Sequence, residues 1–241
     1  MRARGTRGNP PNRFEPVART PTEEEAARLE GESPATQLLS DPSRSIVATN
    51  ESPDVGFDAS VNPYRGCEHG CSYCFARPTH EYLGFSAGLD FETRILVKER
   101  APELLRARLS ARSWKPQVLA LSGVTDPYQP AERRLELTRR CLEVLLEFRN
   151  PVSIVTKSHL VTRDADLLRE LAGFDAASAL VSVTTLDPEL QRAMEPRAAP
   201  PSRRLAAIEL LARAGVPVGV MVAPIVPGLT EHEIPRILAA A

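Results

Sequence analysis

The stretch Gly66-Cys67-Glu68-His69-Gly70-Cys71-Ser72-Tyr73-Cys74-Phe75 holds three of the four cysteines in the chain of 241 residues. Thiolates so close together on one loop can converge on a single metal centre, and soft sulfur ligands suit iron–sulfur clusters and zinc. A cubane iron–sulfur cluster usually takes four cysteines, so three cysteines would leave one iron open. An open iron is what a catalytic metal site requires, so the stretch predicts a metal centre with a chemical role.

A structural zinc site is the alternative, with His69 or His80 as the fourth ligand. Structural zinc sites are closed and tetrahedral, and their ligands usually come as two short pairs separated by a longer loop. This chain has one cysteine triplet, no second pair and only four histidines. Three crowded cysteines and a distant fourth also make a poor disulfide framework. The sequence therefore favours an iron–sulfur cluster over zinc.

The composition is that of an ordinary globular protein, with 42% hydrophobic and 25% charged residues. The net charge of −1 gives no overall footprint of a nucleic-acid-binding protein. No apolar run approaches the roughly 18 residues that a membrane span needs. The basic residues at the start are followed by no apolar stretch, so they do not form a secretory signal. We therefore predict a cytoplasmic protein without a membrane partner.

Two regions are expected along the chain. Residues 1–56 contain several prolines and an acidic run without apolar periodicity, so an extended or disordered segment is predicted there. From residue 57 to 241, short apolar runs alternate with helical patterns, which is typical of a parallel sheet with crossover helices. Strands are predicted at 57–62, 117–121, 152–156, 179–184 and 216–223. Helices are predicted at 96–110, 132–149, 164–172, 202–214 and 234–241, the last opened by the capping box Thr230-Glu231-His232-Glu233.

The spacing Cys-x-x-x-Cys-x-aromatic-Cys, with Tyr73 at the aromatic place, resembles the signature of the radical S-adenosylmethionine (SAM) enzymes. Three further stretches resemble the spore photoproduct lyase-like, or DNA-repair photolyase-like, branch of that superfamily, most of whose members have no assigned substrate. These stretches are Asn62-Pro63-Tyr64-Arg65-Gly66-Cys67, Ala76-Arg77-Pro78-Thr79-His80 and Thr125-Asp126-Pro127-Tyr128-Gln129-Pro130. The resemblance implies an α/β fold, a partial (β/α) TIM-like barrel of six strands in full. Because five are recognisable here, we expect a chain truncated at its C-terminus, or a short protein with a covered sheet edge.

The resemblance also implies the cofactors. A 4Fe–4S cluster on Cys67, Cys71 and Cys74 would bind SAM at its open iron. In the family, the reduced cluster cleaves SAM to a 5′-deoxyadenosyl radical that abstracts hydrogen from a substrate. The electron would come from a flavodoxin- or ferredoxin-like reductant, and the substrate is not identified by the resemblance.

In barrels of this kind the active site lies at the C-terminal ends of the strands, and the resemblance assigns polar residues there to SAM. The methionyl group of SAM is expected near the loop after the second strand and near Lys157 and Arg197, and the ribose and adenine near the ends of the fourth and fifth strands. The residues expected to contact SAM are Tyr73, Ser122, Thr125, Asp126, Lys157, Ser182, Thr184, Arg197 and Pro224. The common Gly-Gly-Glu form after the second strand is replaced here by Ser122-Gly123-Val124-Thr125-Asp126.

Three further functions stay open. A DNA photoproduct lyase would supply a hydrogen-donating cysteine near the end of the second strand, where this chain has Leu121-Ser122-Gly123. The remaining thiol, Cys141, falls on the apolar stripe of a predicted helix and is expected in the core. A nucleic-acid partner is therefore possible but not favoured. The second open function is a chain that binds a cluster but is catalytically inactive, and the third is a zinc-binding module.

Overall fold

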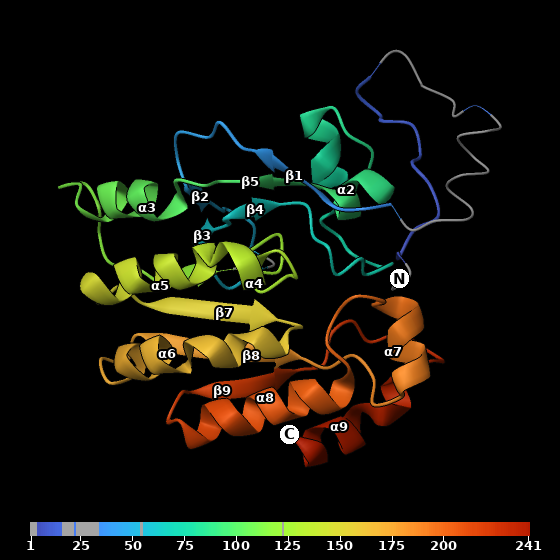
Figure 1. Cartoon of the computed structure of the whole chain (residues 1–241). Helices are drawn as coiled ribbons and strands as arrows, with labels where there is room; N and C mark the ends of the chain where they lie inside the picture. The colour runs from blue at the N-terminus through green and yellow to red at the C-terminus, as the bar shows by residue number, and fades with distance from the viewer. Residues whose placement is uncertain (1–3, 16–21, 23–33, 54, 122) are drawn as a thin grey trace.

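The computed structural model describes residues 4–15, 22, 34–53, 55–121 and 123–241. Its main feature is a six-stranded sheet with the order β2-β3-β6-β7-β8-β9 (Figure 1). Its strands are β2 (Val47–Thr49), β3 (Ala59–Val61), β6 (Leu119–Leu121), β7 (Val152–Thr156), β8 (Ala177–Ser182) and β9 (Val218–Met221). The strands from β3 to β9 run parallel, and β2 pairs antiparallel with β3. The five predicted parallel strands are thus confirmed in order, with ends shifted by a few residues.

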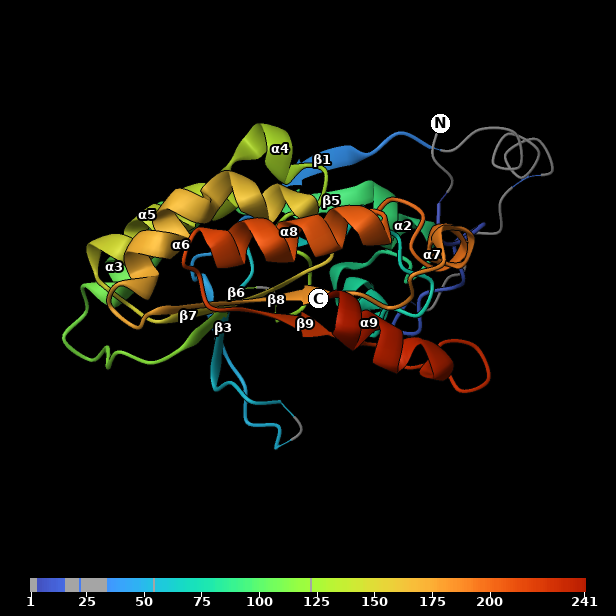
Figure 2. The same ribbon diagram turned by 90° about the horizontal axis from the view of Figure 1, so that it is seen from below.

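Helices follow the parallel strands and cover one face of the sheet. Figure 2 shows α3, α5, α6 and α8 lying along the same side of the strands. The α-helices are α2 (Leu89–Thr93), α3 (Ala101–Leu109), α4 (Glu132–Leu135), α5 (Leu137–Glu147), α6 (Ala165–Ala172), α7 (Pro188–Met194), α8 (Pro201–Arg213) and α9 (Ile234–Ala240). Three 3₁₀ helices are η1 (Arg77–Leu83), η2 (His159–Asp164) and η3 (Glu231–Glu233). The alternation of strand and helix gives a partial (β/α) barrel.

The core lies between the sheet and these helices, as the alternating apolar pattern of the strands requires. Ile154 of β7 belongs to one buried cluster with Leu142 and Leu145 of α5, Leu168 of α6 and Leu211 of α8, all fully buried. Burying each such side chain contributes roughly 1.5–3 kcal/mol. This packing fixes the C-terminal strand ends, from which the loops of the candidate site extend.

A second, three-stranded sheet has the order β1-β5-β4. In it, β1 (Gln37–Ser40) runs parallel to β5 (Arg94–Val97), and β4 (Tyr64–Arg65) runs antiparallel to β5. Residues 34–50 therefore contribute β1 and β2 to two sheets, although no regular element was predicted there. β1 pairs with β5, more than fifty residues farther along the chain, which a local pattern does not reveal, whereas β2 pairs with the nearby β3. The division of the chain at residue 56 stays a prediction.

Three local predictions were wrong. The predicted helix at 96–110 begins as strand β5 and becomes helical only at Ala101, with Pro102 in its first turn. The predicted helix at 132–149 is broken at Glu136, which has a left-handed φ of 51° and separates α4 from α5. The predicted capping box does not form, because the hydroxyl of Thr230 accepts a hydrogen bond from the amide of Val226 instead.

Among the residues described, no helix combines the length and the apolarity that crossing a bilayer requires.

Gly66 makes the turn from β4 into the cysteine loop with a φ of 84°. A Cβ there would lie 2.9 Å from the carbonyl oxygen of Phe91 and 2.9 Å from the ring of His80. We expect Gly66→Ala to lower the free energy of unfolding by at least about 1–2 kcal/mol, the cost of a left-handed conformation alone. Urea titration measures this value. Gly56→Ala is the control, because a Cβ at Gly56 meets nothing within 4 Å; equal effects of the two substitutions would contradict the prediction.

Candidate functional site

The cysteine loop crosses the C-terminal ends of the parallel strands. It follows β4, and the amide of Cys67 donates to the carbonyl of Phe91 at 2.9 Å. All three thiols of the loop are free, and they border a cavity of about 410 Å³, within the usual size range of small-molecule sites. The residues that line this cavity are Cys67, His69, Cys71, Tyr73, Cys74, Phe75, Val124, Thr125, Asp126, Val155, Thr156, Lys157, Met221, Ala223 and Pro224.

Arg77 and Glu92 hold the cysteine loop in position. The guanidinium of Arg77 donates to the carbonyl of Cys71 at 2.8 and 3.1 Å, and it pairs with the buried carboxylate of Glu92 at 2.7 Å. Residues 4–13, here called the N-terminal strap, cover the same carboxylate. Within the strap, the amide of Gly5 donates to Glu92 at 2.8 Å and the hydroxyl of Thr6 donates at 3.1 Å. The position of Cys71 therefore depends on the N-terminal strap as well as on the loop itself.

Asp126 joins three loops of the site through its buried carboxylate. It accepts hydrogen bonds from the amide of Lys157 and the hydroxyl of Thr156, both at 2.7 Å, and from the amide of Tyr128 at 2.8 Å. The ring of His69 lies 3.2 Å away. Burial alone would raise the pKa of Asp126, but His69 and these hydrogen bonds hold it below its usual value, at about 2. The carboxylate is therefore ionised and serves to position the loops.

Lys157 reaches the cavity from the end of β7. Its ammonium donates to the hydroxyl of Ser182 at 2.6 Å and to the carbonyl of Ala223 at 3.4 Å, and it lies 5.8 Å from the centre of the Tyr73 ring. The carboxylate of Glu195 is 3.9 Å away. Glu195 balances part of the charge of Lys157, while the ammonium still borders the cavity, where its hydrogen bonds are to neutral oxygens.

A second buried carboxylate, that of Glu195, holds Tyr73 in place beside Lys157. It accepts hydrogen bonds from the hydroxyl of Tyr73, from the hydroxyl of Thr184 at 2.7 Å and from the guanidinium of Arg204, with which it forms an ion pair. Burial alone would raise the pKa of Glu195, but Arg204 and Lys157 hold it below the ordinary value. Tyr73 is thereby fixed by a partner far along the chain.

Residues 61–241 match the model of the Radical SAM superfamily. The chain belongs to the radical SAM superfamily. It is 44% identical over 187 residues to the uncharacterized protein Rv2578c of Mycobacterium tuberculosis, covering 76% of this chain and 55% of that protein. It is 28% identical over 173 residues to the uncharacterized protein MJ0683 of Methanocaldococcus jannaschii, covering 72% and 62%. The chain thus spans about half the length of the mycobacterial relative.

Among solved structures, the fold resembles that of spore photoproduct lyase complexed with dinucleoside spore photoproduct. The TM-score is 0.58 at 18% identity, and the match covers 95% of this chain and 64% of that chain. A mutant form of the lyase gives a TM-score of 0.59 at 20% identity, covering 94% and 64%. At this identity the likeness shows a shared fold, and it agrees with the partial barrel predicted from the sequence.

The radical SAM fold implies an iron–sulfur cluster, and the donor set of this chain fits one. Among the described residues, no three His, Cys, Asp or Glu side chains lie close enough to hold a single metal ion. Zinc needs every ligand atom within about 2.3 Å of one ion, whereas each thiolate of a cubane binds a different iron. Three thiols around one cavity offer the soft sulfur donors that such a cluster takes. Both proposed histidine ligands are also engaged, His69 with Asp126 and His80 with the carbonyl of Arg94 at 2.9 Å.

Burial sets the protonation state of these thiols. It raises the pKa of Cys67 and Cys74 above the ordinary value and that of Cys71 to about 12. The free thiols are therefore neutral at pH 7, and a positively charged metal centre is needed to hold them as thiolates.

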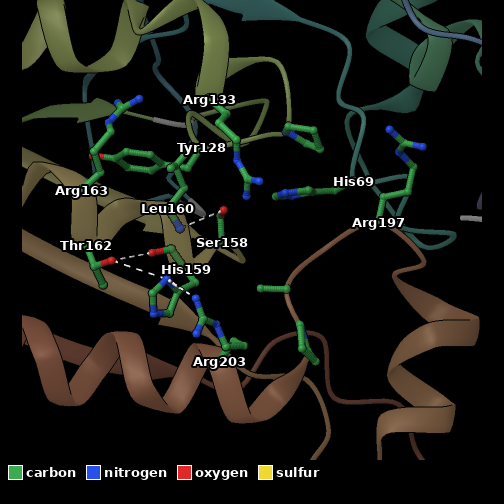
Figure 3. Close-up of a pocket in the computed structure, with 13 residues that line it drawn as sticks. His69, Tyr128, Arg133, Ser158, His159, Leu160, Thr162, Arg163, Arg197 and Arg203 are labelled. Carbon is green, nitrogen blue, oxygen red and sulfur yellow. Dashed lines mark hydrogen bonds between the residues drawn. The ribbon is translucent and has the colours of Figure 1, made fainter.

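Only some of the residues expected to contact SAM line the cavity. Around the cavity it brings together Tyr73, Thr125, Asp126, Lys157 and Pro224 with the three cysteines. Two expected residues, Ser182 and Thr184, are buried behind Lys157 and do not line the cavity. Ser122 lies outside the described residues. Arg197 points elsewhere: it pairs with Glu68 at 3.3 Å and lines a second pocket (Figure 3).

Sequence reasoning missed the roles of His69 and Glu195. His69 was considered only as a zinc ligand. Its position between Cys67 and Cys71 in the sequence was a signal that it lies at the site. Glu195 stands two residues before Arg197, and its pairing with Tyr73 and Arg204 joins segments that are distant in sequence. No local pattern signals that pairing.

Proposed function

We propose that this chain is a SAM-dependent radical enzyme in which Cys67, Cys71 and Cys74 hold a 4Fe–4S cluster with one open iron. The observation that carries the proposal is the cavity that the three free thiols share with Lys157 and Tyr73, at the C-terminal ends of parallel strands. When bound, the cluster and SAM supply a 5′-deoxyadenosyl radical that takes hydrogen from a substrate.

The chain's own residues would bind and shield SAM. Lys157 would offer its ammonium to the carboxylate of SAM, because its present partners are mainly neutral oxygens. Tyr73 and Pro224 would border the adenosyl group. Apolar side chains of Phe75, Val124 and Met221 complete a wall that excludes water from the reacting atoms.

The proposal includes a one-electron reductant of the flavodoxin or ferredoxin type and a cytoplasmic location. The substrate stays unassigned.

Anaerobic reconstitution tests the proposal directly. We expect about four irons and four sulfides per chain, and formation of 5′-deoxyadenosine from SAM once a strong reductant is added. Iron and sulfide without any SAM cleavage would instead support a catalytically inactive cluster-binding chain. One tightly bound zinc and no iron in protein purified without oxygen would support the zinc-binding module.

Lys157→Gln should weaken SAM binding while leaving the iron content unchanged. A charge-assisted hydrogen bond contributes about 1.5–3 kcal/mol, so the expected loss in affinity is about 10–100-fold. Equilibrium dialysis with labelled SAM and reconstituted protein measures it. The matched control is Lys115→Gln, which removes the same charge from an exposed loop. If Lys157→Gln binds SAM as tightly as Lys115→Gln, the assignment of Lys157 is wrong.

Repair of a DNA photoproduct is the second candidate, favoured by the likeness to spore photoproduct lyase. Cys141, the thiol outside the cysteine loop, is fully buried in the core. It therefore has no access to a substrate and cannot act as the hydrogen donor considered above. We place this activity second; recovery of the repaired dinucleoside from dinucleoside spore photoproduct would move it to first.

A further inference from the structure

A second and larger cavity of about 910 Å³ lies on the other side of His69 from the cysteine cavity. It is formed by the loops after β6, β7 and β8 and by the start of α8. We call it the arginine pocket, because four of its lining residues are Arg133, Arg163, Arg197 and Arg203.

The arginine pocket has an unbalanced charge. Its lining includes four guanidiniums and no carboxylate. Two of the guanidiniums are neutralised from outside the pocket: Arg163 pairs with Glu132 and Asp164 at 2.7 Å, and Arg197 pairs with Glu68. Arg133 and Arg203 have no carboxylate partner among the residues that the structure describes.

The side chains of Arg133 and Arg203 face the same space from opposite sides. Figure 3 shows the guanidinium of Arg133 directed towards His69 and Ser158, with Arg203 across the cavity beside His159. The guanidinium of Arg203 donates to Nδ1 of His159 at 3.2 Å. Burial and the charge of Arg203 both lower the pKa of His159, so this ring stays neutral and accepts that hydrogen bond.

The pocket also offers uncharged donors. The hydroxyl of Ser158 lies at its wall and accepts from the amide of Leu160 at 3.2 Å, which leaves its own proton free to donate outward. Helix α8, of 13 residues, begins at Pro201 beside the pocket, and no side chain caps its first turn. The positive end of its dipole adds to the field of the two arginines.

We propose that the arginine pocket is a binding site for phosphate esters, held by Arg133 and Arg203. Guanidinium groups match phosphate oxygens with paired, charge-assisted hydrogen bonds. Two guanidiniums without carboxylate partners suit an anion whose oxygens can accept hydrogen bonds from both of them. A cavity of about 910 Å³ exceeds the needs of an inorganic phosphate, so it accommodates the organic part of an ester as well. A phosphate monoester and a phosphodiester share this chemistry.

Calorimetric titration of the full chain, without SAM or reductant, tests the proposal. The probes are inorganic pyrophosphate, uridine 5′-monophosphate, the dinucleotide uridylyl-uridine and, as the unphosphorylated control, uridine. We expect uridine 5′-monophosphate or uridylyl-uridine to bind 10-fold or more tightly than uridine, and its affinity to fall as salt is added; binding of pyrophosphate alone would contradict an ester site. A preference for the monophosphate identifies a monoester, and a preference for the dinucleotide identifies a diester. Failure of all three phosphorylated probes to bind overturns the proposal.

The variant R133Q/R203Q should lose at least 10-fold in affinity for the phosphorylated probe. Its matched control is R134Q/R213Q, which removes two charges from the same helices, α4 and α8, outside the pocket. Equal affinities in the two double variants would refute the site. Both Arg133 and Arg203 are exposed, so the fold should be retained; a pyrophosphate-induced rise in the melting temperature of the unmodified chain provides a second readout. Because no step requires SAM cleavage, this result is independent of the proposed radical chemistry.

Discussion

Replacing Cys67, Cys71 or Cys74 with alanine should abolish the brown chromophore of the reconstituted protein. The proposed cluster has only three cysteine ligands, and each substitution would leave two thiolates, which are too few to hold a cubane. We expect the formation of 5′-deoxyadenosine to fall by more than about 100-fold, the upper end of losses seen for outer-shell partners of metal ligands. Absorbance in the visible charge-transfer band and iron counts measure the loss of the cluster, and chromatography of the nucleoside product measures the loss of SAM cleavage.

Cys141→Ala is the matched control, since it removes the remaining thiol from the fully buried core. It should keep the iron content and the SAM cleavage of the unmodified chain, while losing about 1–2 kcal/mol of stability through the cavity it leaves. Loss of iron in Cys141→Ala, or full iron content in Cys74→Ala, would contradict the assignment of the three ligands.

Arg204→Ala should be among the most destabilising substitutions in the barrel. Arg204 is 1% exposed and pairs with Glu195, which is fully buried. The guanidinium of Arg204 also donates to the carbonyls of Ala199 at 2.6 Å and Ser182 at 2.9 Å. Removing it leaves a buried carboxylate and two carbonyls without this partner, and such a loss typically costs about 3–5 kcal/mol.

Urea unfolding at pH 7 measures this cost, with Arg213→Ala as the control on the same helix. Arg213 is an exposed residue whose pair with Glu209 is worth at most about 1 kcal/mol. The difference between the Arg204 variant and the unmodified chain should also depend on pH. Because the folded chain holds the pKa of Glu195 below the ordinary 4.5, this stabilisation is complete above about pH 4.5 and is lost as the pH falls through the lowered pKa. A difference that grows on acidification would contradict this account.

The parallel strands were predictable because each is a short buried run between helical patterns. β7 is the clearest case: its side chains alternate between buried and partly buried along 152–156, and the predicted bounds agree with the structure. β1 and β5 were missed because each is completed by a partner more than fifty residues away. The break at Glu136 was missed for a different reason, since a non-glycine residue in the left-handed region leaves little trace in an apolar pattern.

Some residues of the candidate site were predictable from the sequence and others were not. The cysteine triplet and Lys157 follow from motif and strand order, and both line the same cavity. Ser182 and Thr184 also lie at the end of a strand, but side-chain packing directs them behind Lys157, where they hold the carbonyl of Ala223. Arg197 was placed in the correct loop, yet Glu68 holds it on the far side of His69. Which way a side chain turns at a strand end depends on partners that the local sequence does not contain.

The N-terminal strap makes one support of the cysteine loop separable from the barrel. Its contacts are mostly polar, such as the pair of hydrogen bonds between Asn9 and Asp90 and the bonds from Asn12 to the carbonyls of Glu81 and Phe85. Few apolar side chains anchor it, so it can detach at a smaller free-energy cost than the barrel. Local opening of the strap would free one side of the Glu92 carboxylate, and so loosen the support of Arg77 and Cys71, without unfolding the barrel.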